Sequence, residues 1–196
     1  MKNLSEYIKE EYWTSTSTLD PVARLNRRLR DKSKLNNKPK VKVTDENIKD
    51  TVTKILKEDP NANLNHLDVS TVTDMSYLFA KMKDINPDIS EWNVGKVQKM
   101  NHMFFGCEKF NQDLSHWNVS RVENMKYMFC ECKNFNQDIS NWDVSDVKDM
   151  SSMFEYCKSL NQNLSKWDVS RVKYAEHMFL KCDSMKESYK PKFKNK

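Results

Sequence analysis

Glycine is almost missing from this chain: Gly95 and Gly106 are the two glycines among 196 residues. Phosphate-binding loops and dinucleotide-binding fingerprints need several glycines at fixed spacings, so neither motif can be assembled here. The four histidines form no H-E-x-x-H motif, and no serine lies in a nucleophile-elbow motif. The sequence therefore predicts a protein that is not an enzyme and that needs no cofactor.

Long apolar stretches are absent as well. No run approaches the ~18 residues that a transmembrane helix needs, and the first residues lack the apolar segment of a secretory signal. We therefore expect no membrane association. The expected location is intracellular, either in the cytoplasm or in the interior of a virion.

Cysteine occurs five times, an odd number, and four of the five recur at one fixed interval: Cys107, Cys132, Cys157 and Cys182. If these four lie on neighbouring helices about 8–10 Å apart, their Cα atoms exceed the ~7 Å limit for a disulfide. Cys130 and Cys132 form a C-x-C pair, but no second pair stands at a metal-ligand spacing. Buried free thiols and no metal site are the expectation.

What the chain does contain is a 25-residue sequence repeat, written almost five times. Its register is set by one column without insertion or deletion: Leu67, Trp92, Trp117, Trp142 and Trp167. A period this strict is typical of stacked-repeat proteins, because a unit this short cannot bury its apolar face alone.

Each unit is expected to hold one strand and one short helix. The helix is predicted from apolar residues at i, i+3, i+6, i+7 and i+10, which in the fourth unit are Val147, Met150, Met153, Phe154 and Cys157. The strand, near Trp142 to Ser145, is predicted from the L-x-x-L-x-L spacing of Ile139, Trp142 and Val144. The predicted fold is an α/β leucine-rich-repeat-like solenoid of about five 25-residue strand–helix units, with the tryptophan column in its core.

The repeats over residues 67–184 resemble the BspA-like leucine-rich-repeat surface proteins. The shared pattern is W-D/N-V-S-x-V-x-x-M-x-x-M-F-x-x-C/A-x-x-F-N-Q-D. The resemblance implies a binding scaffold, often displayed on cell surfaces for adhesion or recognition, and it implies no catalytic activity.

The segments on either side of the repeats differ in composition. We expect an N-terminal peptide at 1–18, a basic helix and linker at 19–43, a capping helix at 44–60, the repeats at 61–184 and a lysine-rich tail at 185–196. The capping helix should run from Asp45 to about Glu58 with Thr44 as its N-cap. Its apolar face would seal the first repeat.

Positive charge is concentrated outside the repeats. Residues 1–43 hold eleven Lys/Arg against five Asp/Glu, whereas 44–182 hold seventeen against twenty-one. Such an arm gains from counterion release on a polyanion, so DNA contact is one interpretation; a docked helix with solvated arginines is the other. The residues concerned are Arg24, Arg27, Arg28 and Arg30.

The first ten residues, MKNLSEYIKE, resemble the capsid-targeting peptide of internal head proteins in T-even-type bacteriophages. The matching positions are Met1, Lys2, Glu6, Tyr7, Ile8 and Glu10. The resemblance implies cleavage after the triplet that runs from Ile8 to Glu10, which would leave Glu11 as the first residue. An ordinary helical turn with Leu4 on its apolar face is the alternative.

Alternation about each tryptophan places polar residues outward. The candidate partner-binding residues are His66, Asp68, Glu91, Asn93, His116, Asn118, Asn141, Asp143, Lys166 and Asp168. The column after the tryptophan is always Asn or Asp, which favours a hydrogen-bonded ladder between units. The column before it varies, as a recognition surface requires. The sequence thus predicts a non-catalytic scaffold for a protein partner, or alternatively a bacteriophage internal head protein, processed at Glu10, packaged with DNA and delivered to the host.

Overall fold

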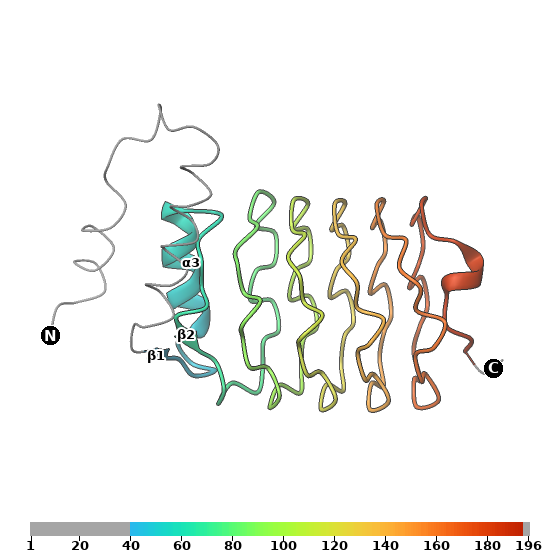
Figure 1. The fold of residues 1–196 in the computed structure, drawn as a ribbon, viewed down its shortest axis with the longest axis horizontal. Helices are drawn as coiled ribbons and strands as arrows, with labels where there is room; N and C mark the ends of the chain where they lie inside the picture. Colours follow the sequence, from blue (N-terminus) through green and yellow to red (C-terminus); the bar gives the residue numbers. More distant parts are fainter. Residues whose placement is uncertain (1–39, 194–196) are drawn as a thin grey trace, which may run out of the picture. The chain divides into compact units, whose positions relative to one another are not determined.

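Residues 40–193 are described by the computed structural model. Their regular elements are strand β1 (Val41–Lys42), helix α3 (Ile48–Glu58), strand β2 (Leu67–Asp68) and the 3-10 helix η1 (Glu187–Tyr189). From residue 61 onward the chain forms similar coils, one for each sequence repeat, that stack one after another (Figure 1).

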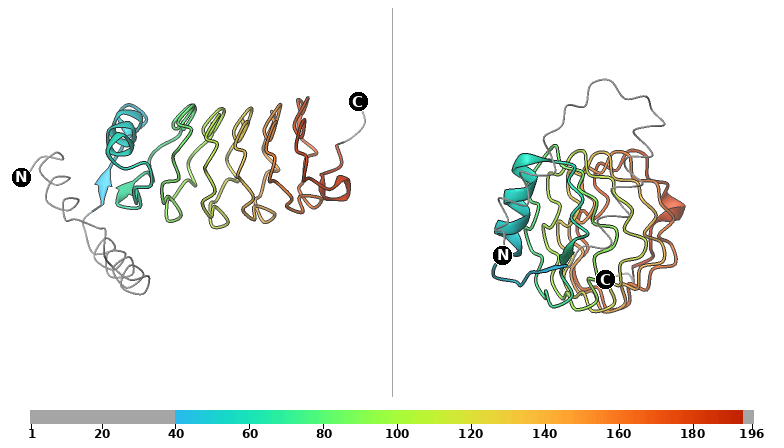
Figure 2. Two further views of the ribbon diagram at one scale, coloured as in Figure 1. Left: turned by 90° about the horizontal axis from the view of Figure 1, so that it is seen from above. Right: turned by 60° about the vertical axis from the view of Figure 1, so that its left-hand side comes forward.

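Helix α3 lies at the N-terminal end of this stack, against the first coil (Figure 2). Ile48, Val52 and Leu56 are buried there. The helix begins three residues later than the sequence predicts, and its N-cap is Asn47 rather than Thr44. The carboxylate of Asp45 accepts hydrogen bonds from the backbone N–H and hydroxyl of Thr73 at 2.8 and 2.7 Å, which ties the start of the helix to the first repeat.

The predicted fold of five strand–helix units is wrong. In the described part of the chain α3 is the single α-helix, and the single strand pair is β1 with β2, parallel, with Val41 opposite Leu67. The segment 147–157, predicted to be helical, forms successive turns. The segment 142–145, predicted to be a strand, forms no strand ladder with any residue between 40 and 193.

Positive φ angles are one physical reason why the repeats form no helix. In the fourth unit Ser152 has φ 53° and Tyr156 has φ 61°, whereas an α-helix needs φ near −63° at every residue. The same two positions are left-handed in every unit: Tyr77, Lys81, His102, Gly106, Tyr127, Glu131, His177 and Lys181.

Hydrogen bonds between neighbouring units are the other reason. Alternate N–H groups of the fourth unit, from Met150 to Tyr156, donate to carbonyls of the fifth unit, from Tyr174 to Leu180, at 2.8–3.0 Å. A helix would need these N–H groups for its own carbonyls. Four of the five isolated parallel bridges therefore lie where the sequence predicts helix, as at Asp149 and Tyr174, and the fifth joins Asn63 to Asp88.

The core residues, in contrast, are those that the sequence predicts. The tryptophan column is buried, with Trp117 at 3% exposed, and each Trp Nε1 of this column donates to a carbonyl 28 residues earlier at 2.9–3.2 Å. Phe79, Phe104, Phe129 and Phe154 stack at centroid distances of 5.3–5.7 Å. The core assignment of the tryptophans is confirmed, and the continuous apolar column holds the coils together.

Candidate partner-binding surface

The residues that flank each tryptophan lie outside the core, as the alternation predicts. The side chains before it are exposed in four successive units, and we call this set the recognition column: Glu91, His116, Asn141 and Lys166. In the first unit His66 is half-buried, and its Nδ1 lies 3.1 Å from the carbonyl oxygen of Asn63. The structure thus separates His66 from the four other members of its column.

The column after the tryptophan has a structural use within each unit. In every unit the Oδ1 atom of this Asn or Asp side chain accepts a hydrogen bond from the backbone N–H two residues later, at 2.9–3.2 Å. The five residues are Asp68, Asn93, Asn118, Asp143 and Asp168. In the fourth unit the Ser145 hydroxyl and N–H both donate to Asp143 and lower the pKa of its carboxyl. These bonds close local turns, which is a different use from the ladder between units that the sequence favours.

An asparagine ladder between units does exist, at positions that were not among the predicted site residues. The backbone N–H groups of Asn111, Asn136 and Asn161 each donate to the Oδ1 of the asparagine 25 residues earlier, at 2.9–3.0 Å. Asn86 is the first acceptor. The recurrence of F-N-Q-D in the sequence is the signal that could have identified this ladder.

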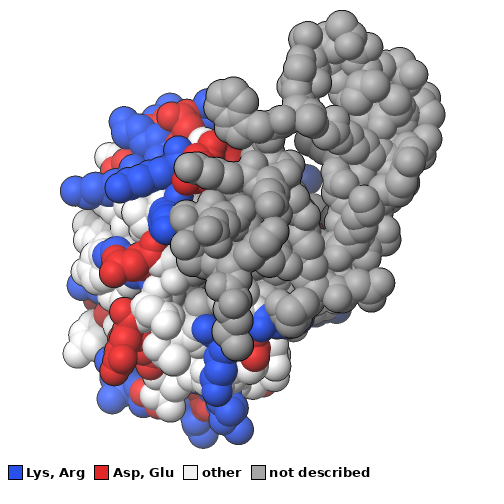
Figure 3. Space-filling model, turned by 90° about the vertical axis from the view of Figure 1, so that its left-hand side faces the viewer, with Lys and Arg blue, Asp and Glu red and all other residues white. Residues whose placement is uncertain are grey.

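Many charged side chains of the coils are paired with a residue one unit away. Ion pairs between consecutive units join Lys99 to Asp74, Lys109 to Asp84, Lys133 to Glu108 and Arg171 to Asp146. Such exposed pairs contribute roughly 0–1 kcal/mol each. On the uncovered part of the surface in Figure 3, acidic and basic side chains are likewise interspersed.

The recognition column differs from this framework. The side chains of its four residues form no hydrogen bond or ion pair with any residue between 40 and 193. They also differ in type: a carboxylate, an imidazole, an amide and an ammonium group, one in each unit. The column is therefore not required by the internal bonding of the coils and is free to contact another molecule.

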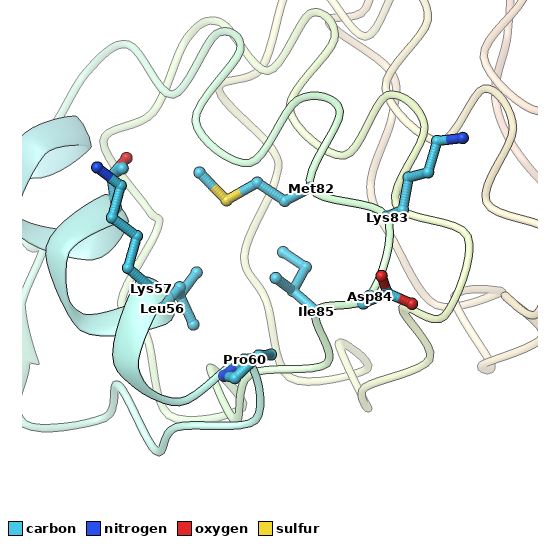
Figure 4. A pocket seen from close by; sticks show the side chains of 8 residues that line it. Leu56, Lys57, Pro60, Met82, Lys83, Asp84 and Ile85 are labelled. Carbon is cyan, nitrogen blue, oxygen red and sulfur yellow. The ribbon is translucent and has the colours of Figure 1, made fainter.

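A shallow pocket of about 330 Å³ lies between α3 and the first coil (Figure 4). Leu56, Pro60, Met82 and Ile85 line most of it, together with Thr53, Lys57, Lys83 and Asp84. Lys83 points away from the pocket in Figure 4, and Asp84 is paired with Lys109 at 2.6 Å. This arrangement is an apolar hollow without the converging polar groups that chemistry requires.

The five cysteines are free and buried, as the sequence predicts, although not for the reason of helix spacing. Thiols of the cysteine column donate to the carbonyls of phenylalanines 28 residues earlier, as Cys132 does to Phe104 at 3.0 Å. Burial raises the pKa of Cys107 and that of Cys130 to about 12, so the reactive thiolate is not populated at neutral pH. Within residues 40–193 no three His, Cys, Asp or Glu side chains are grouped to hold a metal ion.

The remaining predicted sites lie outside the described residues. They are the arginines Arg24, Arg27, Arg28 and Arg30 and the processing residues Ile8, Glu10 and Glu11. In the part of the chain that is described, no helix is both long and apolar enough to cross a membrane.

One protein-family model matches the chain, and its description is "Mycoplasma protein of unknown function, DUF285". The matched segments are residues 46–139 and 115–195, which together span α3, all the coils and η1. No curated protein and no solved structure matches the chain.

Proposed function

We propose that this chain, which belongs to the DUF285 family of Mycoplasma proteins, is a non-catalytic scaffold that binds a protein partner through its recognition column. The observation that carries the proposal is the contrast between two adjacent columns. Asn93, Asn118, Asp143 and Asp168 close the turns of their units, whereas no side chain of the recognition column forms a hydrogen bond or ion pair with the described residues, and His116 acts on Asp113 through its charge alone. Side chains that can vary on a fixed frame are what recognition of a specific partner requires.

The order of side chains in the column indicates the chemistry of the partner. Isolated parallel bridges, such as the one between Lys99 and Asn124, join consecutive units, and chains paired in this way lie about 4.8 Å apart, so four successive units extend over roughly 15 Å. Glu91 lies at one end of the column and Lys166 at the other, with His116 and Asn141 between them. A complementary partner would place a cation opposite Glu91 and a carboxylate opposite Lys166, which would fix the direction in which it binds.

Resemblance to the BspA-like surface proteins also supports a binding scaffold. The alternative, a bacteriophage internal head protein, depends on residues 1–10 and on the basic arm, which lie outside the described residues. It stays a prediction, and no observation on residues 40–193 favours it over the scaffold.

The proposal can be tested by site-specific photocrosslinking in the native producer. A benzophenone amino acid would replace Glu91, His116, Asn141 or Lys166, one at a time, and the same partner is expected to crosslink from adjacent positions. The control positions are Tyr77 and Tyr156, which are also exposed but lie on the turns of other columns.

The partner found in this way would then be titrated against the triple variant Glu91→Ala, His116→Ala, Lys166→Ala. Affinity should fall by at least about tenfold, because three contacts of modest strength are removed together. An unchanged dissociation constant, or equal crosslinking from Tyr77 and Tyr156, would show that recognition does not use this column.

A further inference from the structure

One segment of each coil has peptide groups that point along the stack in a single direction. In the fourth unit this segment is 149–156. The carbonyl of Asp149 accepts from the N–H of Met125 in the unit before, at 2.9 Å, and the N–H of Met150 donates to the carbonyl of Tyr174 in the unit after, at 2.8 Å. The carbonyl of Asp149 and the N–H of Met150 belong to the same peptide group. Its dipole is therefore parallel to the stack, with the positive N–H end toward the C-terminal units.

Four such peptide groups occur in this segment, and they continue from coil to coil. The chain of bonds through the phenylalanines, for example, runs from Phe79 to Met103, from Phe104 to Met128, from Phe129 to Met153 and from Phe154 to Met178, at 2.9–3.0 Å. Hydrogen bonds in series polarise one another, so each chain has a positive end at its last N–H.

A few other peptide groups point the opposite way. The N–H groups of Lys148 and Ser159, on either side of the segment, donate to carbonyls of the unit before, at 2.8 and 3.1 Å. The uniform direction therefore belongs to the segment between them, and its positive end is confined to one edge of the last coil.

Four N–H groups at this edge of the last coil have no acceptor among residues 40–193. They belong to Ala175, His177, Phe179 and Lys181, which are equivalent to the donors Met150, Ser152, Phe154 and Tyr156 one unit earlier. The backbone is the same, because His177 and Lys181 have φ 58° and 60°. The edge thus repeats the donor side of every earlier unit.

Side chains at this end are also less covered than their equivalents. Val172 and Phe179 are partly exposed, whereas Val147 and Phe154 are fully buried. Tyr174 and Leu180, at the two ends of the same segment, are 54% and 40% exposed. At the opposite end of the stack the buried residues of α3 cover the first coil, so the two ends differ.

We propose that residues 174–181, the C-terminal edge of the stack, bind an extended acidic segment of a partner protein through these four N–H groups. The partner would add one more layer, with alternate carbonyls accepting from the edge and apolar side chains against Tyr174 and Leu180. An acidic segment fits best, because the N–H ends are positive and residues 166–192 hold seven Lys/Arg against four Asp/Glu.

A second copy of this chain fits the edge poorly. Two copies of the C-terminal edge would place donors opposite donors, and α3 covers the first coil at the other end of the stack in each copy. The proposal does not depend on the recognition column, which lies on the side of the coils rather than at their end.

The probe for a direct test is a synthetic peptide of four Glu-Val repeats, added to the full-length ¹⁵N-labelled chain. Without the peptide, the amides of Ala175, His177, Phe179 and Lys181 should exchange with solvent much faster than the bonded amides of the equivalent residues one unit earlier. With saturating peptide, the exchange of the four edge amides should slow by at least about tenfold. No binding at millimolar peptide, or slowing elsewhere on the chain, would overturn the proposal.

Variants provide a second test that does not require exchange data. Ala175→Pro removes one edge N–H and should weaken binding of the Glu-Val peptide about fivefold. Lys181→Glu keeps the backbone but reverses a charge at the edge, and it should also weaken binding, whereas Lys96→Glu, on an exposed residue of the second unit, should not. Equal affinity of Lys181→Glu and Lys96→Glu would contradict the edge as the binding site, even if Ala175→Pro fails to fold.

Discussion

At the scale of single residues, the repeat depends on short polar side chains that bond to their own backbone. Asp113, Asp138 and Asp143 each accept from a serine N–H two residues later. The backbone N–H is the main reason for the lowered pKa of Asp113 and Asp138, and the Ser145 hydroxyl is the main reason for the lowered pKa of Asp143. Asn118 performs the same role with an amide, so the acceptor oxygen matters more than the charge.

These carboxylates predict sensitivity to acid. Because each folded-state pKa lies below the ordinary value of 3.8, the stabilisation is complete above that pH and is lost as pH falls through the folded value. The triple variant Asp113→Asn, Asp138→Asn, Asp143→Asn keeps the acceptors but cannot be protonated in this range. Its acid unfolding, followed by tryptophan fluorescence, should have a midpoint at lower pH than that of the unchanged protein.

The reverse substitution is a matched control. Asn118→Asp introduces a titrating acceptor at the position equivalent to Asp143, and its acid midpoint should move to higher pH. A shift of the two variants in the same direction would mean that the turn acceptors do not determine acid stability.

At the scale of the element, the building block is a turn with a left-handed residue rather than a helix. Gly106 is the one glycine among the ten left-handed positions of residues 40–193, at φ 72°, and side chains of other kinds fill the other nine. A left-handed L-residue costs roughly 1–2 kcal/mol, which here is offset by the hydrogen bonds to the next unit. Neighbouring coils thus hold the turns in a conformation that an isolated peptide would rarely adopt.

The two glycines allow this strain to be measured. Gly106→Ala should lower the free energy of unfolding by about 1 kcal/mol, because a residue with a Cβ is strained in the left-handed backbone conformation of this position. Gly95→Ser should not destabilise, because serine holds this position in the other four units and the Ser120 hydroxyl bonds its Asn118 at 2.8 Å. Urea titration of both variants is the measurement, and equal losses of stability would contradict the assignment of strain to residue 106.

At the scale of the whole described region, stability comes from contacts between consecutive coils. The core is one cluster that runs from Val43 to Met185. Ring stacking, tryptophan hydrogen bonds and the asparagine ladder all join neighbouring units. Repeat arrays of this kind gain stability with each added interface, approximately as a sum over nearest neighbours.

Addition of a unit should therefore stabilise the protein. A second copy of residues 135–159, inserted after Ser159, restores every column in register, and the Tm should rise by several degrees. The control is the same insertion with Asn141 deleted from the inserted copy. The deletion moves the Trp142 of that copy out of the buried column and should lower the Tm. Differential scanning calorimetry of the two insertions is the measurement; equal Tm values would argue against stacking in strict register.

Prediction of the core succeeded where prediction of the backbone failed. Met150, Met153, Phe154 and Cys157 are buried, as their spacing indicates. A spacing of three and four residues is also compatible with consecutive turns, however, and no pattern within one unit separates the two backbones. The distinction depends on whether the N–H of a residue such as Phe154 bonds within its unit or to the next unit.

The sequence by itself determined the 25-residue period, the residues of the core, the free thiols and the outward positions of the candidate surface, because these follow from hydrophobicity and strict repetition. The tertiary structure alone decided the backbone of each unit, the turn-closing use of Asp143 and its equivalents, and the alternate N–H groups from Ala175 to Lys181 that bond to no residue between 40 and 193. These features depend on hydrogen bonds between coils. Such bonds exist only after the units have stacked, so no unit read alone can reveal them.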